Sequence, residues 1–284
     1  MKNVSFVLII ILFSACSGRK NVVANSSNET VGKFILKDVA EVEKLSNSNP
    51  ISTETKVQIK DVSTEKTAAI QVFNHSKWND LLQKYVSQKG NVNYKGFKTD
   101  RKKLLSYISN LSANTPAESC SKQDQLAYWI NAYNALTIDL ILQNYPVKSI
   151  KAIKDPWEQR LWKLGTTWYN LNDIEHQILR KMNDPRIHFA IVCASVSCPK
   201  LLNEAYTSKH LETQLTDATI AFLSDTERNV ITENSIALSK IFQWFAKDFK
   251  QNGDIIDFIN QYSDVKISEK AKKSFKDYNW DLNE

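Results

Sequence analysis

The sequence predicts an α+β fold: a single, mostly helical domain with a small, mainly antiparallel sheet and a buried central helix at about 121–144. Three observations predict it. The stretch 121–144 is apolar on nearly every side of a helix, and several other stretches have amphipathic helical spacing. Short alternating runs at 160–171 and around Glu233-Asn234 are typical of β-hairpins. The stretch 72–284 is long enough to bury one substantial core.

The central helix has clear end signals and two unusual polar residues. Ser121-Lys122-Gln123-Asp124 has the character of a capping box, and Tyr145-Pro146 ends the helix. Asn131 and Asn134 lie on neighbouring positions of one face. Because an unpaired buried amide costs ~1–3 kcal/mol, both need partners. They either tie the helix to loop or strand backbone, or line a cleft where they bind and orient a catalytic or substrate group.

The other elements follow from periodicity and turn signals. Asn183-Asp184-Pro185 reads as a turn, so an apolar strand is expected from near Ile187, ending in the loop that contains Cys198. Helices are expected at about 76–88, 100–112, 172–182, from 207, 240–250 and 253–262.

Residues 1–15 predict a lipoprotein signal peptide. The apolar run 4–13, broken by Ser5, is too short to span a bilayer but suits the core of a secretory signal. Leu12-Phe13-Ser14-Ala15-Cys16 looks like a bacterial lipobox, whose cysteine is diacylated and becomes the mature N-terminus. We expect palmitate-type chains on Cys16 to anchor the protein in the bacterial cell envelope, on the periplasmic face or in the outer membrane.

Residues 16–71 predict a flexible tether that precedes a globular domain at 72–284. The tether is rich in Asn, Ser, Thr, Lys and Glu, and Phe34 is its one aromatic residue. The net charge of +6 is modest and the two signs are interleaved, which argues against nucleic acid as a partner. No Gly-rich phosphate motif is present, and no cofactor is expected. The expected partners are the membrane, through the lipid, and an unidentified envelope peptide, glycan or protein.

Several ordered blocks of the sequence resemble the DUF547 family, a domain of unknown function found in bacteria and plants. The resemblance covers about 75–283. Val192 stands where Asn is common in the family, and Asn279 where Asp is common. The family implies little about activity, so the chemistry must come from the residues. The blocks are LAYWINAYNALTIDLIL, YPVKSI, DIEHQILR, DPRIHFAIVCASVSCPKL, EAYT, LSKIFQWFAKDF and YNWDLN.

The block RIHFAIVCASVSCPKL predicts a site at its cysteines. A thiol nucleophile needs a lowered pKa and a nearby base, so Cys193 and His188 are the candidate catalytic pair of a hydrolase or acyl transferase. In a regular strand these two side chains face opposite sides, ~16 Å apart. The hypothesis therefore needs a sharp bend, or a base such as His176 from the preceding helix. Ser195 and Ser197 are candidate binding residues.

Three alternatives remain open for the same residues. Outside the cytoplasm, Cys193 and Cys198 would tend to form a disulfide. Cys-x4-Cys with His176, His188 or His210 could bind zinc, although the spacing is looser than in usual zinc sites, and no metal site is assigned. The domain could also be a non-catalytic envelope binding or scaffold module that presents exposed tryptophans.

Overall fold

The computed structural model describes residues 72–284, and the predicted signal peptide, lipidated Cys16 and tether lie outside the described residues. The α+β class and the mostly helical content are confirmed. Seven α-helices are present in the described part: α1 Ser76–Tyr85, α2 Tyr94–Thr99, α3 Arg101–Ala113, α4 Lys122–Asn144, α5 Leu211–Leu223, α6 Ile241–Trp244 and α7 Ile255–Ile259. Short 3-10 or π-helical turns are η1 Ile150–Ala152, η2 Asp173–Leu179, η3 Arg180–Met182, η4 Pro185–Phe189 and η5 Asp248–Lys250.

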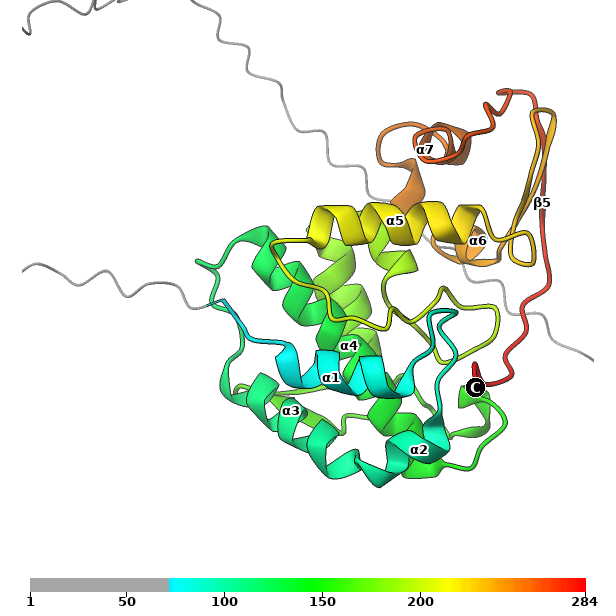
Figure 1. Ribbon diagram of the computed structural model, residues 1–284. Helices are drawn as coiled ribbons and strands as arrows, with labels where there is room; N and C mark the ends of the chain where they lie inside the picture. Colours follow the sequence, from blue (N-terminus) through cyan, green and yellow to red (C-terminus); the bar gives the residue numbers. More distant parts are fainter. Residues whose placement is uncertain (1–71) are drawn as a thin grey trace, which may run out of the picture. The chain divides into compact units, whose positions relative to one another are not determined.

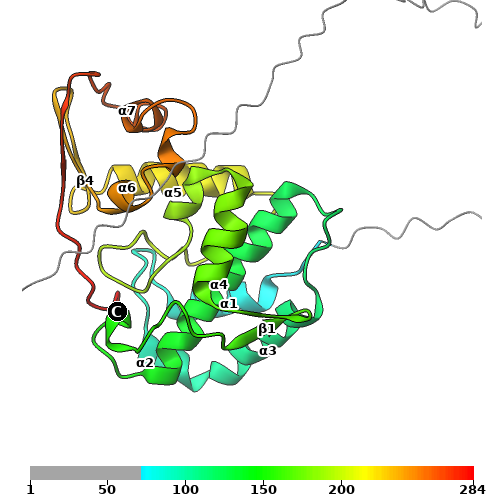
Figure 2. The ribbon, with the colours of Figure 1, turned by 180° about the vertical axis from the view of Figure 1, so that it is seen from behind.

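The predicted central helix is α4, and it is buried along most of its length. Every residue from 126 to 142 is buried, because α1, α2 and α3 lie on one side of α4 and later segments cover the other (Figures 1 and 2). The Ser121 hydroxyl accepts a hydrogen bond from the Asp124 amide at 3.1 Å, so the helix begins where the capping signal predicts. None of the described helices is both long and apolar enough to cross a membrane.

The strands form two small sheets. β1 (Trp162–Leu164) and β2 (Thr167–Tyr169) make the hairpin expected around Gly165. β3 (Val230–Ile231) and β4 (Ser235–Leu238) make the second predicted hairpin, and β5 (Lys272–Phe275) adds to β4 in parallel. After β5 the chain runs back to the helical core, where the C-terminus lies (Figure 1).

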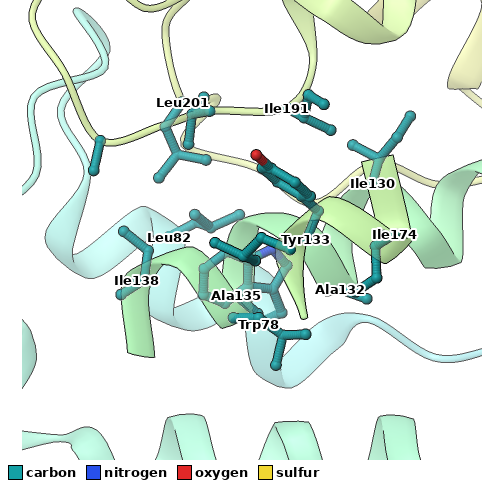
Figure 3. Close-up of a cluster of buried hydrophobic side chains, with 14 of the residues drawn as sticks. Trp78, Leu82, Ile130, Ala132, Tyr133, Ala135, Ile138, Ile174, Ile191 and Leu201 are labelled. Atoms are coloured by element: carbon teal, nitrogen blue, oxygen red, sulfur yellow. The ribbon is translucent and has the colours of Figure 1, made fainter. Parts of the chain in front are cut away.

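Two apolar clusters form the core of the described part. The first surrounds α4; Figure 3 shows part of it, with the Tyr133 ring directed from α4 toward the segment that carries Ile191 and Leu201. The second contains Phe189, Phe242 of α6 and aromatic residues before and after that helix. Phe189 reaches the second cluster from a segment that otherwise packs in the first, since Ile187 and Ile191 on either side of it belong to the first cluster.

The strand predicted from Ile187 is wrong. Asp184 accepts a hydrogen bond from the Arg186 amide, and Pro185 occupies the first position of the 3-10 helix η4, so the chain coils here. The apolar side chains that follow are buried between two clusters and not within a sheet. A short apolar run cannot by itself distinguish these two forms of burial.

Helix boundaries differ from the predictions in three further places. The helix expected from 207 begins at Leu211, and α2 was not predicted. The two helices expected at 240–250 and 253–262 are shorter pieces, α6, η5 and α7, separated by turns. Gly253, at φ +134°, lies just before the Asp254 cap of α7, which explains the break between η5 and α7.

Candidate functional site

The segment carrying the cysteines is held against the central helix by Asn134. The Asn134 amide donates to the Ala190 carbonyl at 2.9 Å, and its oxygen accepts from the Val192 amide at 2.9 Å. Asn131 makes the equivalent pair of bonds to the backbone of Tyr206, at 2.7 and 3.0 Å. Both side chains bond backbone groups and neither lines the cleft described below, which is the first of the two roles predicted for them.

The chain turns sharply after Cys193 and returns at Cys198. Ala194 adopts a left-handed conformation, with φ 58°, and the Cys198 amide donates to the Ser195 carbonyl at 3.0 Å. The C-terminal tail fixes this turn: the amide of Val196 donates to Asp281, and the Ser197 hydroxyl accepts from the Asn279 amide at 2.8 Å. The turn is the bend that a site at these cysteines requires.

Three polar groups surround the Cys193 sulfur. The Sγ atom of Cys198 lies 3.0 Å away, and the hydroxyls of Ser195 and Tyr278 each lie at 3.2 Å. Ser195 donates its hydrogen to the Tyr278 oxygen at 3.1 Å, which leaves the Tyr278 hydrogen free to point at the sulfur. The Cys198 thiol, followed by the Ser195 and Tyr278 hydroxyls, lowers the pKa of the Cys193 thiol to about 7 against the opposing effect of burial. The surroundings of Cys193 therefore favour its thiolate form, which is the form that acts as a nucleophile.

Cys193 opens into a cavity of about 180 Å³, which we call the Cys193 cleft. Four of its lining residues are aromatic side chains that contact one another and form an aromatic wall, Trp157, Trp244, Tyr278 and Trp280. In that wall the ring of Trp280 lies 4.6 Å from Tyr278, 5.7 Å from Trp244 and 5.9 Å from Trp157, between centroids. The lining residues are Tyr133, Trp157, Asn172, Glu175, His176, His188, Ile191, Val192, Cys193, Cys198, Pro199, Ile241, Trp244, Phe245, Tyr278 and Trp280.

His188 lines the cleft and is hydrogen-bonded to the carboxylate of Asp248. Its Nε2 donates to the Asp248 Oδ2 atom at 2.8 Å, and its ring stacks on Phe245 at 4.0 Å. Nδ1 has no hydrogen-bond partner among the described residues and keeps its lone pair. Burial lowers the pKa of His188 below its ordinary value against the opposing Asp248 carboxylate, so the ring is neutral near pH 7. A neutral imidazole oriented by a carboxylate is the arrangement of a general base.

His176 is linked to the same carboxylate through Arg180. Arg180 binds Asp248 with two nitrogens, at 2.6 and 2.8 Å, and donates a third hydrogen bond to the Nδ1 of His176 at 2.8 Å. Because arginine has only donors, the ring hydrogen of neutral His176 is on Nε2. Burial and the Arg180 charge lower the pKa of His176. His176 is therefore a hydrogen-bond donor at the cleft, whereas His188 is a base.

A buried carboxyl group completes the polar lining. Glu175 lies on the π-helical turn η2, and its Oε2 atom is 3.1 Å from the Tyr133 hydroxyl. Burial raises the pKa of Glu175 to about 7, against the lowering effect of the Tyr133 bond. Single π-turns are frequent at functional sites because they reorient one side chain.

The structure gathers some predicted site residues and leaves others apart. His188, His176 and Cys193 line the same cleft. The strand geometry from which their separation was calculated does not apply, because the chain forms η4 and then a turn. No direct hydrogen bond between His188 and Cys193 occurs in the described part. The Ser195 hydroxyl contacts the Cys193 sulfur, whereas the Ser197 hydroxyl accepts a hydrogen bond from the C-terminal tail. His210 lies at the start of α5, outside the cleft.

Sequence reasoning missed four residues of the site: Asp248, Arg180, Tyr278 and Glu175. All four fall in sequence blocks that resemble the family, and His176 and Arg180 have the i, i+4 spacing of helix neighbours. Cys193 and Cys198 are free thiols in the structure. Among residues 72–284 there is no group of three or more His, Cys, Asp or Glu side chains arranged to hold a metal ion.

Comparison with known proteins gives one match. No curated protein and no solved structure matches the chain. Residues 117–223 match the family model described as "Protein of unknown function, DUF547". This range includes α4, both cleft histidines and both cysteines, but ends before Asp248 and Tyr278. The match supports a DUF547 domain in this part of the chain.

Proposed function

We propose that the domain is a thiol-dependent hydrolase or acyl transferase with Cys193 as its nucleophile. The observation that carries the proposal is the set of three polar groups within 3.2 Å of the Cys193 sulfur, in a cleft that also contains a carboxylate-oriented histidine. A buried structural thiol is usually surrounded by apolar groups that raise its pKa. Here the surroundings favour the thiolate.

The reaction begins with attack of the Cys193 sulfur on the carbonyl carbon of an ester, thioester or amide. The bond to the leaving group breaks and an acyl-thioester forms on Cys193. His188 Nδ1 first takes up a proton, from the Cys193 thiol or from solvent, and then gives it to the departing group, which returns His188 to its neutral form. In the second half, His188 takes a proton from water, or from an acceptor alcohol or amine, as that molecule attacks the thioester. Both residues line the same cavity, so a substrate or water bound in it can contact each of them.

Two other groups support the charge that develops. The oxygen of the tetrahedral intermediate becomes negative and needs donors fixed in advance. The Nε2 hydrogen of His176 is a donor with this orientation, because Arg180 occupies Nδ1. Glu175, whose pKa is raised to about 7 by burial, holds a proton part of the time and lies in the same cleft.

The aromatic wall indicates which kind of chemical group lies next to the carbonyl of the substrate. Trp244 is 46% exposed although it is large and apolar, and it stacks on Trp280 beside the cleft. Rings of this kind bind apolar chains or the flat faces of sugars and aromatic groups. We infer that the acyl donor carries such a group and not a charged one.

The proposal is tested with chromogenic p-nitrophenyl esters of short and aromatic acids. Wild type is expected to hydrolyse them above background, and Cys193→Ala to reduce the rate to background. Asp248→Asn is expected to reduce kcat by roughly 10²–10⁴, because the neutral amide no longer fixes the His188 tautomer. Cys120→Ala, which changes a thiol outside the cleft, is the matched control. Turnover that survives Cys193→Ala would overturn the proposal.

We also propose that the chain is a lipoprotein of the bacterial cell envelope, anchored through Cys16. The lipobox-like Leu12-Phe13-Ser14-Ala15-Cys16 after an apolar run supports it. Growth with alkyne-palmitate is expected to label the wild-type chain in the membrane fraction, and Cys16→Ser to abolish the label. Label that persists on Cys16→Ser, or an unlabelled wild type, would contradict the anchor.

A further inference from the structure

Cys193 and Cys198 form an unusually close pair of free thiols at the edge of the cleft. Their sulfur atoms are 3.0 Å apart, and the Cys193 amide also donates to the Cys198 sulfur at 2.9 Å. Both cysteines line the cleft, but Cys193 is half-buried whereas Cys198 is only 4% exposed. Cys193 is therefore the more open of the two to small molecules.

The two thiols differ in the way that an attacking and a resolving cysteine differ. Hydrogen bonds lower the pKa of Cys193, whereas burial and the neighbouring Cys193 raise the pKa of Cys198. The acceptor role of Cys198 toward the Cys193 amide fixes the direction of its sulfur. Bond formation needs the sulfurs to approach from 3.0 Å to the ~2.05 Å of a disulfide.

The turn between the two cysteines is already closed by the rest of the fold. The Asn283 amide donates to the Ala194 carbonyl at 3.3 Å, and Arg228 Nε donates to the Cys198 carbonyl at 2.9 Å. The backbone is thus held in the looped form that a disulfide across four intervening residues requires. No large rearrangement of the C-terminal tail is needed to bring the sulfurs together.

We propose that Cys193 and Cys198 are a reversible redox pair that reacts with low-molecular-weight disulfides. The Cys193 thiolate attacks one sulfur of a disulfide RSSR, forming a mixed disulfide and releasing one thiolate, which takes up a proton as RSH. Cys198 then loses its proton and attacks the Cys193 sulfur, closing the intramolecular disulfide and releasing the second RSH. The two cysteines are oxidised by two electrons, and RSSR is reduced to two RSH.

The pair would also control the proposed acyl chemistry, and this part rests on the proposed function. Cys193 has no free sulfur in the disulfide, so acyl transfer stops until a thiol reduces the pair. A permanent structural staple is different, because its cysteines would remain oxidised in mild reductant. The reversible pair predicts a resting reduced form in which Cys193 is reactive.

The experiment incubates the reduced full-length chain with oxidised glutathione, without any acyl donor. Alkylation with one reagent before reduction and another after it, read by peptide mass spectrometry, measures each cysteine. Wild type is expected to form the Cys193 to Cys198 disulfide with little bound glutathione, and excess reduced glutathione to reverse it. Cys198→Ser is expected to stop at a glutathione adduct on Cys193. Cys120→Ser, the matched control, is expected to behave as wild type.

The outcomes separate this proposal from the acyl one. A wild type that accumulates as much mixed disulfide as Cys198→Ser, or that does not react, would overturn the redox pair. The wild-type result is sufficient by itself if Cys198→Ser fails to fold, which its near-ultraviolet circular dichroism reports. The glutathione assay contains no ester, so its result does not depend on the acyl chemistry. If the chain exchanges with glutathione but fails to hydrolyse the p-nitrophenyl esters in the separate assay, the acyl proposal is overturned and the redox pair stands.

Discussion

The Tyr278 hydroxyl is one of the donors that hold Cys193 as a thiolate, and its removal has a calculable effect. The oxygen lies 3.2 Å from the Cys193 sulfur. A hydrogen bond to a charged group contributes ~1.5–3 kcal/mol, and this long contact belongs at the lower end. Since about 1.4 kcal/mol corresponds to one pH unit, Tyr278→Phe should raise the Cys193 pKa from about 7 to about 8.

Alkylation by iodoacetamide as a function of pH measures this change, because only the thiolate reacts. At pH 7 the thiolate fraction falls from about a half to about a tenth, so Cys193 should react about five-fold more slowly in Tyr278→Phe, with equal rates well above pH 9. Fragmentation of the labelled peptide separates Cys193 from Cys198. Tyr262→Phe, a tyrosine outside the cleft, should leave the profile unchanged. An unchanged midpoint in Tyr278→Phe would refute the assigned role of the donors.

Two further predictions concern stability. Asn134→Ala leaves the Ala190 carbonyl and the Val192 amide unpaired, and should lower the free energy of unfolding by about 2–4 kcal/mol in urea titrations; the exposed control Asn144→Ala should lower it by less than about 0.5. Equal losses would contradict the role of Asn134. Burial raises the pKa of Glu175 to about 7 in the folded chain, from about 4.5 in the unfolded chain. Between these two pH values Glu175 is ionised in the unfolded chain but protonated in the folded chain, so folding becomes less favourable as the pH rises. The free energy of unfolding of Glu175→Gln should therefore rise relative to wild type between about pH 5 and pH 8, by at most about 3 kcal/mol. The exposed control Glu118→Gln should show no such rise. A difference between Glu175→Gln and wild type that stays constant across this pH range would contradict the raised pKa.

The central helix was predictable from sequence because its signals are local. Ser121 and Asp124 mark its start, and the apolar residues on every side of 126–142 require burial whatever surrounds them. The need of Asn131 and Asn134 for partners also followed from their position. Which partners they have did not, because the Tyr206 and Ala190 carbonyls come from segments far away in the chain.

The site was predictable in place but not in geometry. The cysteines and His188 stood out by residue type, yet a strand was expected where η4 and a left-handed turn at Ala194 occur. The turn depends on hydrogen bonds from the C-terminal tail. The orientation of His188 depends on Asp248, which lies 60 residues later in the chain. Such long-range partners leave no local pattern in the sequence, so Asp248 and Tyr278 could be found only in the folded chain.

The most direct test of Cys193 as the nucleophile is to trap the acyl group on it. The full-length chain is mixed with p-nitrophenyl acetate, quenched with acid within the first turnover, and digested for mass spectrometry. An acetyl group on Cys193 that hydroxylamine removes is the predicted result, with Cys198 and Cys120 unmodified. Acetyl groups confined to Ser195, Cys120 or surface lysines, with Cys193 free, would contradict the account.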